Sequence, residues 1–427
     1  MNYLLYRFTA FLRQKGLLEE AYLVGGAVRD ILLGRELKDM DIAIKGDTIG
    51  LSREFAYATD ASFVLLDEEF SVARVVKGEY WLDISKMRCD SLFIDLSERD
   101  FTINAMAIPL SNLQDPHRYL IDVFNGLEDL QQGIIRMISE ENFIKDPLRI
   151  IRAFRFAATL NYSISDQTLQ AIKGLTPLIS SVSYERIADE LKKTLLCQNS
   201  APIVRLMVGL KVFTHVFAMT FRETQLEGYC RLENMVSDVK RFFPEVHFPI
   251  ARYLCCHSRT FALKFTTLFE GHTQAVDAAR QLRLSKRDIE LIQRLIELSG
   301  LFYRLYKTGV EPDTEEVIRF FLNAQKELYG AILFDLAHHN NGYDLLNYAN
   351  RIIAFYEDQY RKRQALLPLI TGQDLIEGFG LSTSPVFRKI LNHVEFLTLC
   401  GKASSREEAL RAVSEFLGQT TLPQSTA

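Results

Sequence analysis

The stretch YLVGGAVRDILLGRELKDMDIAI, residues 22–44, decides the fold of the first part of the chain. An apolar run ends in Gly25 and Gly26, and the residues that follow have the apolar spacing of a helix. Arg29 lies one helical turn after the glycines, and Asp39 and Asp41 then lead into a second apolar run. The stretch therefore predicts a strand, a tight turn, a helix and another strand.

This unit brings together residue types that suit phosphate chemistry. Backbone N–H groups of a diglycine turn before a helix can face an anion, and Gly25 and Gly26 let a phosphate approach closely, with Arg29 pointing back at it. Asp39 and Asp41 share one face of a strand, and such paired carboxylates suit Mg²⁺, which leaves room for substrate phosphates. Alone, a diglycine is usually a turn and an Asp-x-Asp is usually solvated. Their combination predicts phosphoryl or nucleotidyl transfer with two metals.

The rest of the chain divides by its hydrophobic pattern. Short strand-like runs that end at turn residues mark the first part, and from about Gly133 the pattern is helical. The predicted fold class is α+β: a mixed sheet with flanking helices, followed by an elongated all-α region. The predicted strands are 22–26, 41–46, 62–67, 71–78 and 80–85, and the predicted domains are a head (1–135), a neck (136–200), a body (201–365) and a tail (366–427).

Composition limits the class of protein. The 427 residues are 48% hydrophobic and 24% charged, as in an ordinary globular protein, and the net charge of −4 requires any RNA site to come from local clusters. We see no uninterrupted apolar run of about 18 residues and no signal peptide core, so we expect no membrane partner. The six cysteines are scattered without metal-ligand spacing, which favours reduced thiols and a cytoplasmic location.

Several segments resemble one family in the same order. LVGGAVRDILLG…DMDIAI resembles the first motif of class II tRNA nucleotidyltransferases and bacterial poly(A) polymerases, in the polymerase-β superfamily. ERDFTINAMAI (98–108) resembles the family's RRD segment, with Glu98 in place of the first arginine. KDPLRIIRAFRFAATL (145–160) resembles its EDxxR motif, with Lys145 in place of the glutamate, and SYERIADELKKTLL (183–196) resembles the next neck helix. The strong match covers roughly the first 200 residues.

The resemblance implies a reaction and its metal. The reaction is template-independent transfer of CMP, with AMP as a second candidate, from CTP or ATP to the 3′ end of tRNA. Asp39 and Asp41 are expected to hold Mg²⁺, and Asp83 is a third candidate ligand, with a strand-end turn residue as its alternative reading. Gly26 and Arg29 are expected to contact the triphosphate.

The resemblance also implies how the sugar is held. Arg99 is expected to help hold the nucleotide, Asp100 to accept a hydrogen bond from the ribose 2′-hydroxyl, and Asn104 to assist. A surface ion pair between Arg99 and Asp100 is the alternative.

Asp146 and Arg149 are candidates for reading the base, because residues three apart on a helix can act in one plane. The carboxylate would accept from an exocyclic amine and the guanidinium would donate to a ring nitrogen. Cytosine and adenine offer that pattern, whereas guanine and uracil offer the reverse. A simple salt bridge is the alternative, and Pro147 places Asp146 at a helix N-cap in either case. Arg152 and Arg155 are expected to extend the cationic face toward phosphates.

The number and kind of nucleotides added depend on one segment. KMRCDSLFIDLS (86–97) is short where relatives that complete CCA usually carry a longer flexible loop, which favours addition of CC. Full CCA addition, A addition and poly(A) synthesis stay open, although GQTTLPQSTA (418–427) is not the basic tail that many poly(A) polymerases carry. A non-catalytic RNA-binding protein is the alternative from another class, and the intact Asp39 and Asp41 count against it.

The helical remainder is expected to hold RNA. Residues 263–296 resemble a decayed HD phosphohydrolase module in which Glu270 and Gly271 stand where the His-Asp pair belongs, so a helical scaffold is expected there. No pattern in the sequence specifies an oligomeric state. The candidate phosphate contacts in the body and tail are Lys286, Arg287, Arg388 and Lys389.

Overall fold

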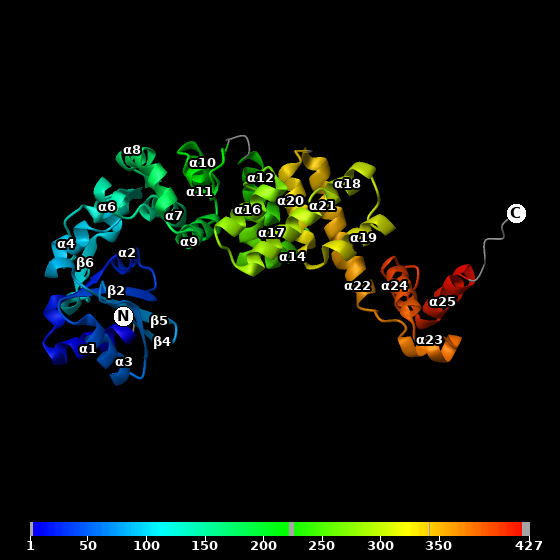
Figure 1. The fold of residues 1–427 in the computed structure, drawn as a ribbon, viewed down its shortest axis with the longest axis horizontal. Coiled ribbons are helices and arrows are strands. Elements are labelled where there is room, and N and C mark those ends of the chain that lie inside the picture. Colours follow the sequence, from blue (N-terminus) through cyan, green and yellow to red (C-terminus); the bar gives the residue numbers. More distant parts are fainter. Residues whose placement is uncertain (1–2, 222–225, 341, 421–427) are drawn as a thin grey trace. The chain divides into compact units, whose positions relative to one another are not determined.

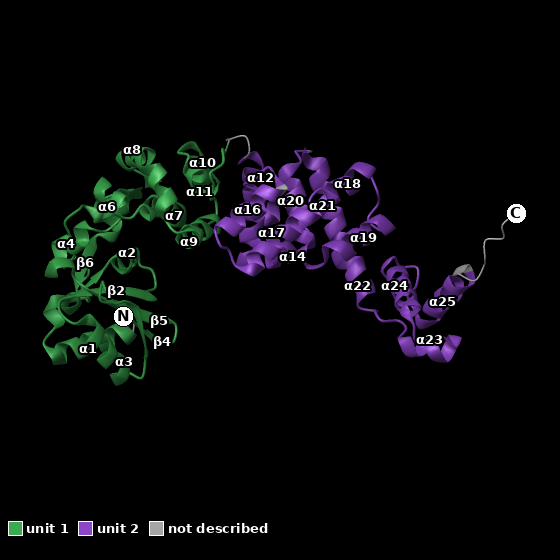
Figure 2. Cartoon of the chain, viewed as in Figure 1, with its two compact units in different colours: residues 1–221 green, residues 222–427 purple. Residues whose placement is uncertain are grey.

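The computed structural model describes residues 3–221, 226–340 and 342–420. The chain forms two compact units, residues 1–221 and residues 222–427 (Figure 2). The predicted four-part division is finer than these two units and stays a prediction. The C-terminal segment 421–427, which carries most of the predicted non-basic tail, lies outside the described residues.

A seven-stranded mixed sheet organises the first unit, in the order β3-β4-β5-β2-β1-β6-β7 (Figure 1). Strands β2 and β5 run parallel, and the other neighbours run antiparallel. The mixed sheet confirms the predicted fold class of the head, and all five predicted strands are present. The strands are β1 (Ala21–Val24), β2 (Asp39–Ile44), β3 (Ser62–Asp67), β4 (Val72–Lys77), β5 (Tyr80–Lys86), β6 (Met106–Pro109) and β7 (Ile121–Asp122).

The parallel pairing of β2 and β5 places the acidic residues. Met40, Ile42 and Ile44 alternate along β2 and are fully buried, so Asp39 and Asp41 point to the opposite face of the strand. In the register, Asp41 lies directly beside Asp83 of β5. Two segments that are far apart in the sequence therefore deliver carboxylates to one place on the sheet.

Short helices connect and cover the strands. Helix α2 (Gly26–Leu32) follows β1 at once, with Gly25 as its N-cap, as the opening stretch predicted. The Asp47 side chain accepts from the N–H of Gly50 at 2.9 Å and so caps α3. The other helical elements of this part are α1 (Tyr3–Lys15), η1 (Leu18–Glu20), α3 (Thr48–Ala58), η2 (Arg88–Asp90), α4 (Leu92–Ser97), η3 (Thr102–Asn104), η4 (Leu110–Asn112) and α5 (Gly126–Gln132).

Helices dominate the unit after β7. In α7 (Leu148–Leu160), Ile150, Phe154 and Ala157 recur at helical spacing and are buried, so this amphipathic helix packs against its neighbours. A parallel pair of short strands, β8 (Ile134–Ile135) and β9 (Ser163–Ile164), brings the chain before α6 (Glu140–Lys145) beside the chain after α7. The remaining helices are α8 (Asp166–Leu175), α9 (Tyr184–Leu195), α10 (Ala201–Gly209) and α11 (Val212–Phe217).

The second unit is helical throughout its described residues, which confirms the predicted all-α remainder. Its core contains a buried ion pair between Lys264 Nζ and Glu233 Oε2, 2.9 Å apart, and Glu270 and Gly271 lie between α15 and α16. Its helices are α12 (Leu226–Ser237), α13 (Val239–Phe242), α14 (His247–Leu254), α15 (His257–Thr266), α16 (His272–Gln281), α17 (Lys286–Leu298), α18 (Leu301–Thr308), α19 (Glu315–Ala324), α20 (Leu328–His338), α21 (Gly342–Phe355), α22 (Arg361–Gln364), α23 (Gly372–Phe379), α24 (Pro385–Leu399) and α25 (Arg406–Thr420).

Within the described ranges of both units, we find no helix that combines the length and the apolar character needed to cross a membrane.

Candidate functional site

Three carboxylates meet at the β2–β5 pair. Among the described residues, Asp39, Asp41 and Asp83 form a group in which one oxygen of each lies within 4.8 Å of the others. Burial, together with the neighbouring carboxylates, raises the pKa of Asp41 to about 6, although the Arg99 guanidinium lowers it. Burial and the charge of Asp83 also raise the pKa of Asp39. The site thus concentrates negative charge that a divalent cation would neutralise.

One member of this group is already paired with a cation. Arg74 Nε and Nη2 donate to the two oxygens of Asp83, each at 2.7 Å. This bidentate contact reduces the charge that Asp83 can offer a metal, whereas we find no bidentate partner of Asp39 or Asp41 within the described parts of the chain. The predicted pair Asp39 and Asp41 is therefore the better ligand set, with Asp83 and Arg74 beside it.

The turn at Gly25 lies against the same carboxylates. Gly25 has φ +71° and ψ −137°, a conformation that residues with a side chain rarely adopt. A Cβ at this position would lie 2.7 Å from Arg99 Nη1 and 3.0 Å from Asp41 Oδ2. The absence of a side chain therefore lets the backbone, the guanidinium and the carboxylate share one small space.

Arg29 turns back toward the start of its own helix, as predicted. A Cβ at Gly26 would lie 3.3 Å from Arg29 Nη2. Arg29 is buried, and its Nη1 donates to Asn104 Oδ1 at 2.7 Å while its Nε donates to Asp30 Oδ1 at 3.1 Å. The guanidinium is thus fixed at the beginning of α2.

Asp100 lies at the centre of a buried polar network. Its Oδ1 accepts from Asn104 Nδ2 at 3.0 Å and from the N–H of Phe101 at 2.9 Å. Its Oδ2 accepts from Arg152 Nε at 2.9 Å and Nη2 at 2.7 Å. Burial raises the pKa of Asp100, but Arg152 and Asn104 outweigh burial and hold it below its ordinary value. Asp100 thus pairs with Arg152 of α7. The predicted alternative was an ion pair between Arg99 and Asp100, but Arg99 pairs with Asp95, with Arg99 Nη2 and Asp95 Oδ2 3.0 Å apart.

Arg152 and Arg155 are directed inward. Arg155 Nε and Glu190 Oε2 are 2.7 Å apart in ion-pair contact without hydrogen-bond alignment, and Arg152 Nη1 lies 3.7 Å from Glu190 Oε1. The Arg155 guanidinium also lies 3.6 Å from the centre of the Phe156 ring, which Arg29 and Arg152 approach at 5.4 and 5.3 Å. Their predicted contact with phosphates stays a prediction, since both arginines already serve the buried Glu190.

The two base-reading candidates have separate partners. Asp146 Oδ2 accepts from Arg186 Nη2 at 3.0 Å, and Arg149 Nη1 donates to the main-chain oxygen of Arg99 at 3.3 Å. The alternative reading, a simple salt bridge between Asp146 and Arg149, is therefore not what the structure shows: each side chain has the partner named above. Asp146 also accepts from the N–H of Leu148 at 3.4 Å, but the N-cap of α7 is Pro147 and not Asp146 as predicted, and Asp146 is the C-cap of α6.

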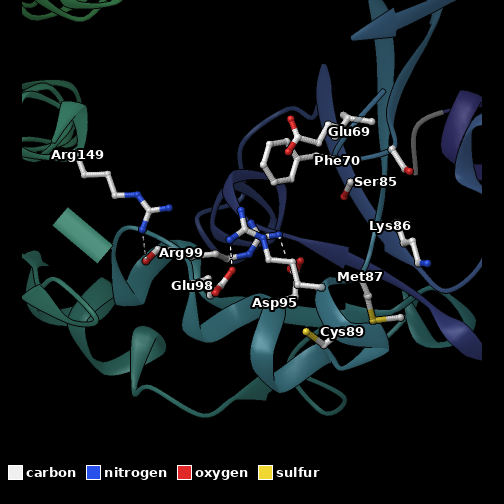
Figure 3. Close-up of a pocket in the computed structure, with 13 residues that line it drawn as sticks. Glu69, Phe70, Ser85, Lys86, Met87, Cys89, Asp95, Glu98, Arg99 and Arg149 are labelled. Atoms are coloured by element: carbon white, nitrogen blue, oxygen red, sulfur yellow. Dashed lines mark hydrogen bonds and ion pairs between the residues drawn. The ribbon is translucent and has the colours of Figure 1, made fainter. Parts of the chain in front are cut away.

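A pocket of about 470 Å³ lies beside Arg99 and Arg149 (Figure 3). Arg99 and Arg149 line it together with the tip of the β3–β4 hairpin and the segment after β5. Arg99 Nε is buried without a hydrogen-bond partner among the described residues, as expected of a donor that a ligand would complete. The lining residues are Glu69, Phe70, Ser71, Val72, Ser85, Lys86, Met87, Arg88, Cys89, Asp95, Glu98, Arg99 and Arg149.

Sequence reasoning missed four supporting residues: Arg74, Asp95, Phe156 and Glu190. Arg74 occupies a strand position, so only its register with Asp83 reveals the pairing. Glu190 had a signal in the sequence, because it lies on the apolar side of the predicted helix 183–196, where a carboxylate needs a partner.

Two family models match the chain. One, described as "Poly A polymerase head domain", matches residues 21–136, and another, described as "Probable RNA and SrmB- binding site of polymerase A", matches residues 161–222. Together they cover the sheet, the acidic group and the helices around α9.

Curated relatives with three different specificities are similar over nearly the whole chain. A CC-adding tRNA nucleotidyltransferase of Geobacter sulfurreducens is 31% identical, covering 95% of this chain and 93% of the relative. An A-adding tRNA nucleotidyltransferase of Halalkalibacterium halodurans is 30% identical, with coverages of 92% and 88%. A CCA-adding enzyme of Streptococcus gordonii is 36% identical, with 92% of each chain covered.

Solved structures are similar as well. A structure titled "tRNA-processing enzyme with CTP" has a TM-score of 0.67 and 27% identity, covering 90% of this chain and 100% of that chain. A "CCA-adding enzyme with CTP" has a TM-score of 0.72 at 24% identity, with coverages of 99% and 95%, and supports the fold.

Proposed function

The chain belongs to the class II tRNA nucleotidyltransferases of the poly(A) polymerase family, and from this membership we propose that it adds CC to the 3′ end of tRNA with CTP as the substrate. Family membership makes the protein a template-independent tRNA nucleotidyltransferase, as the family resemblance implied. The observation that carries the proposal is the acidic group beside the Gly25 turn, next to a pocket lined by Arg99 and Arg149.

Enzymes of this family use a divalent metal, and we assign Mg²⁺ to Asp39 and Asp41. Hard carboxylate oxygens at this spacing, with the raised pKa of Asp41, suit that ion. A metal held by Asp39 and Asp41 would make the RNA 3′-hydroxyl more acidic and would neutralise charge at the α-phosphate, from which pyrophosphate is the leaving group. Asp83 supports this pair from β5, and Arg74 keeps that third carboxylate in place.

The chain's cations are arranged to hold the nucleoside triphosphate. Gly26 and the fixed guanidinium of Arg29 suit the phosphates, and the buried donor of Arg99 suits the same group. Asp100 can accept a hydrogen bond from the ribose 2′-hydroxyl only if one of its present donors moves away. Asn104 is one of these donors, and it also accepts from Arg29, so we include Asn104 in the proposed ribose site.

Asp146 and Arg149 are proposed to select the base. The carboxylate accepts from the exocyclic amine and the guanidinium donates to the ring nitrogen, which admits cytosine and adenine and rejects guanine and uracil. A good bidentate contact discriminates by about 1–3 kcal/mol against a wrong base. Arg186 donates to Asp146 in this structure. When a base binds, Arg186 must therefore either release Asp146 or contact the base together with it.

Choice between cytosine and adenine is proposed to depend on the segment after β5. Relatives with CC, A and CCA specificity have similar identities to this chain, so identity does not choose among them. Segment 86–91 is short and leads directly into α4, and part of it lines the pocket. A short segment has little freedom to change the size of the pocket between cytosine and adenine, and this favours CC addition.

The test is extension of a tRNA that ends at its discriminator base, with CTP and ATP singly and together, resolved on a sequencing gel. We expect arrest after two additions even when ATP is present. A third addition would establish CCA addition, a long homopolymer would establish poly(A) synthesis, and bound but unextended tRNA would establish a non-catalytic role.

The tRNA contacts and the location complete the proposal. Residues 161–222, with the helical second unit, are proposed to hold the tRNA body, and Arg388 and Lys389 on α24 are candidate phosphate contacts. A cytoplasmic location is supported by thiols that remain free, among them Cys89 and Cys400.

A further inference from the structure

Two residues that differ from the family motifs, Glu98 and Lys145, lie within ion-pair distance of each other. Glu98 stands where the family has arginine, and Lys145 stands where it has glutamate. In this structure Lys145 Nζ lies 3.5 Å from Glu98 Oε1, and also 3.5 Å from Glu141 Oε1 on its own helix. The sign of the charge is thus reversed at both positions, and the two side chains are within ion-pair distance.

Glu98 has a second cationic partner in the segment after β5. Arg88 Nη1 donates to Glu98 Oε2, and Arg88 begins the single turn η2. Hydrogen bonding by Arg88, with the charge of Lys145, holds the pKa of Glu98 below its usual range. One carboxylate therefore connects segment 86–91 to the last residue of α6. We call Arg88, Glu98 and Lys145 the clamp.

The clamp surrounds the residues proposed to read the base. Glu98 directly precedes Arg99, whose main-chain oxygen accepts from Arg149, and Lys145 directly precedes Asp146. Arg88, Glu98, Arg99 and Arg149 all line the same pocket, and Figure 3 shows Glu98, Arg99 and Arg149 around it. A shift of the clamp would therefore move a pocket wall and the carbonyl that holds Arg149.

The geometry explains how a clamp can affect the choice of base. Cytosine and adenine present the same amine and ring nitrogen to the reading pair, so those two groups alone cannot separate them. Adenine extends one ring further, so it requires a wider pocket than cytosine does. Residues 86–89 form part of the pocket wall, and Glu98 holds Arg88 of this segment.

We propose that Glu98 is a specificity-determining positioning residue, which clamps segment 86–91 to the end of α6 and thereby favours cytosine over adenine. The inference rests on the proposed function. Glu98 and Lys145 are 30% and 52% exposed, and exposed ion pairs stabilise a fold only weakly. The expected effect of the clamp is thus on nucleotide choice and not on folding.

The test measures kcat/KM for CTP and for ATP at the first added position, with tRNA that ends at the discriminator base. In Glu98→Arg the new guanidinium faces both Arg88 and Lys145, and we expect the CTP/ATP ratio to fall by about fivefold or more, the range of two broken exposed pairs. The triple variant Glu98→Arg, Arg88→Glu, Lys145→Glu restores both contacts with opposite sign, and we expect its ratio to return to within about twofold of the wild-type value.

The matched control is another exposed pair of the head, Lys38 and Glu79, whose Nζ and Oε2 are 3.4 Å apart. Glu79→Arg should leave the ratio unchanged, and all variants should keep the wild-type unfolding midpoint. An unchanged ratio in Glu98→Arg, or a lowered ratio that the triple variant does not restore, would overturn the proposal. The wild-type arm reports separately on the proposed function, because it shows how many nucleotides are added whatever the variants do.

Discussion

Replacing Gly25 with alanine tests how closely the turn is fitted to the catalytic group. The new Cβ would lie 2.7 Å from Arg99 Nη1 and 3.0 Å from Asp41 Oδ2, closer than such atoms pack. Either the turn or those two side chains must move by several tenths of an ångström to about 1 Å. Misplacement on that scale can lower a rate by about 100-fold, so we expect CMP incorporation to fall by about that factor.

The backbone contributes a separate effect on stability. Gly25 has φ +71° and ψ −137°, outside the left-handed helical region, and backbone strain of this kind costs about 1–3 kcal/mol. Gly16, which follows α1, also has a positive φ of +73°, and a Cβ there would meet nothing within 4 Å. Gly16→Ala is therefore a control for a side chain at a positive φ without the collision.

The assay compares CMP incorporation into tRNA and the thermal unfolding midpoint for both variants. We expect some loss of stability in both variants, with activity lost in Gly25→Ala alone. Nearly full activity in Gly25→Ala, or an equal loss of activity in Gly16→Ala, would refute the argument that the space beside Asp41 and Arg99 requires glycine.

Three further predictions concern buried charges. Glu190→Gln should lower the free energy of unfolding by about 3 kcal/mol in urea titrations, because Arg155 would lose its buried partner. The pKa of buried Asp335 is raised from 3.8 to about 6, so its contribution to the free energy of unfolding should fall by up to about 3 kcal/mol as pH rises from 4 past 6, and Asp335→Asn should lack this part of the pH dependence measured by urea titration. Lys264→Met should destabilise by about 3–5 kcal/mol in the same titrations by leaving Glu233 without its ammonium, and adding Glu233→Leu should recover most of that loss.

Local patterns predicted the parts of the fold that local chemistry determines. The diglycine turn, the helix after it and the strand from Asp39 were all readable, because strand and helix periods differ and glycine marks the turn. The family that this stretch and the later segments resemble is confirmed by the comparisons. Strands β6 and β7 were not predicted, since they are short and owe their conformation to pairing with β1 and with each other.

Pairings between distant segments were beyond local patterns. Asp100 was expected at the ribose, and only the contact of α7 with the segment between α4 and η3 shows that Arg152 donates to its Oδ2. Lys145 and Glu98 each looked like an isolated departure, and their contact is visible only when the end of α6 is placed beside the end of α4. The residue types in the sequence identified the chemistry, whereas only the three-dimensional structure showed which charged side chains form ion pairs.

The central claim is that Asp41, with Asp39, is present for a metal and not for stability. Because burial and like charges raise the pKa of Asp41 to about 6, its ionised form disfavours the folded state at neutral pH. The most direct test is the rate of CMP incorporation into tRNA by Asp41→Asn in saturating Mg²⁺, with the unfolding midpoints of the variant and the wild type measured without Mg²⁺, because a bound metal would stabilise the wild type alone. We predict loss of incorporation with a midpoint equal to or above that of the wild type; incorporation at the wild-type rate in the folded variant would contradict the account.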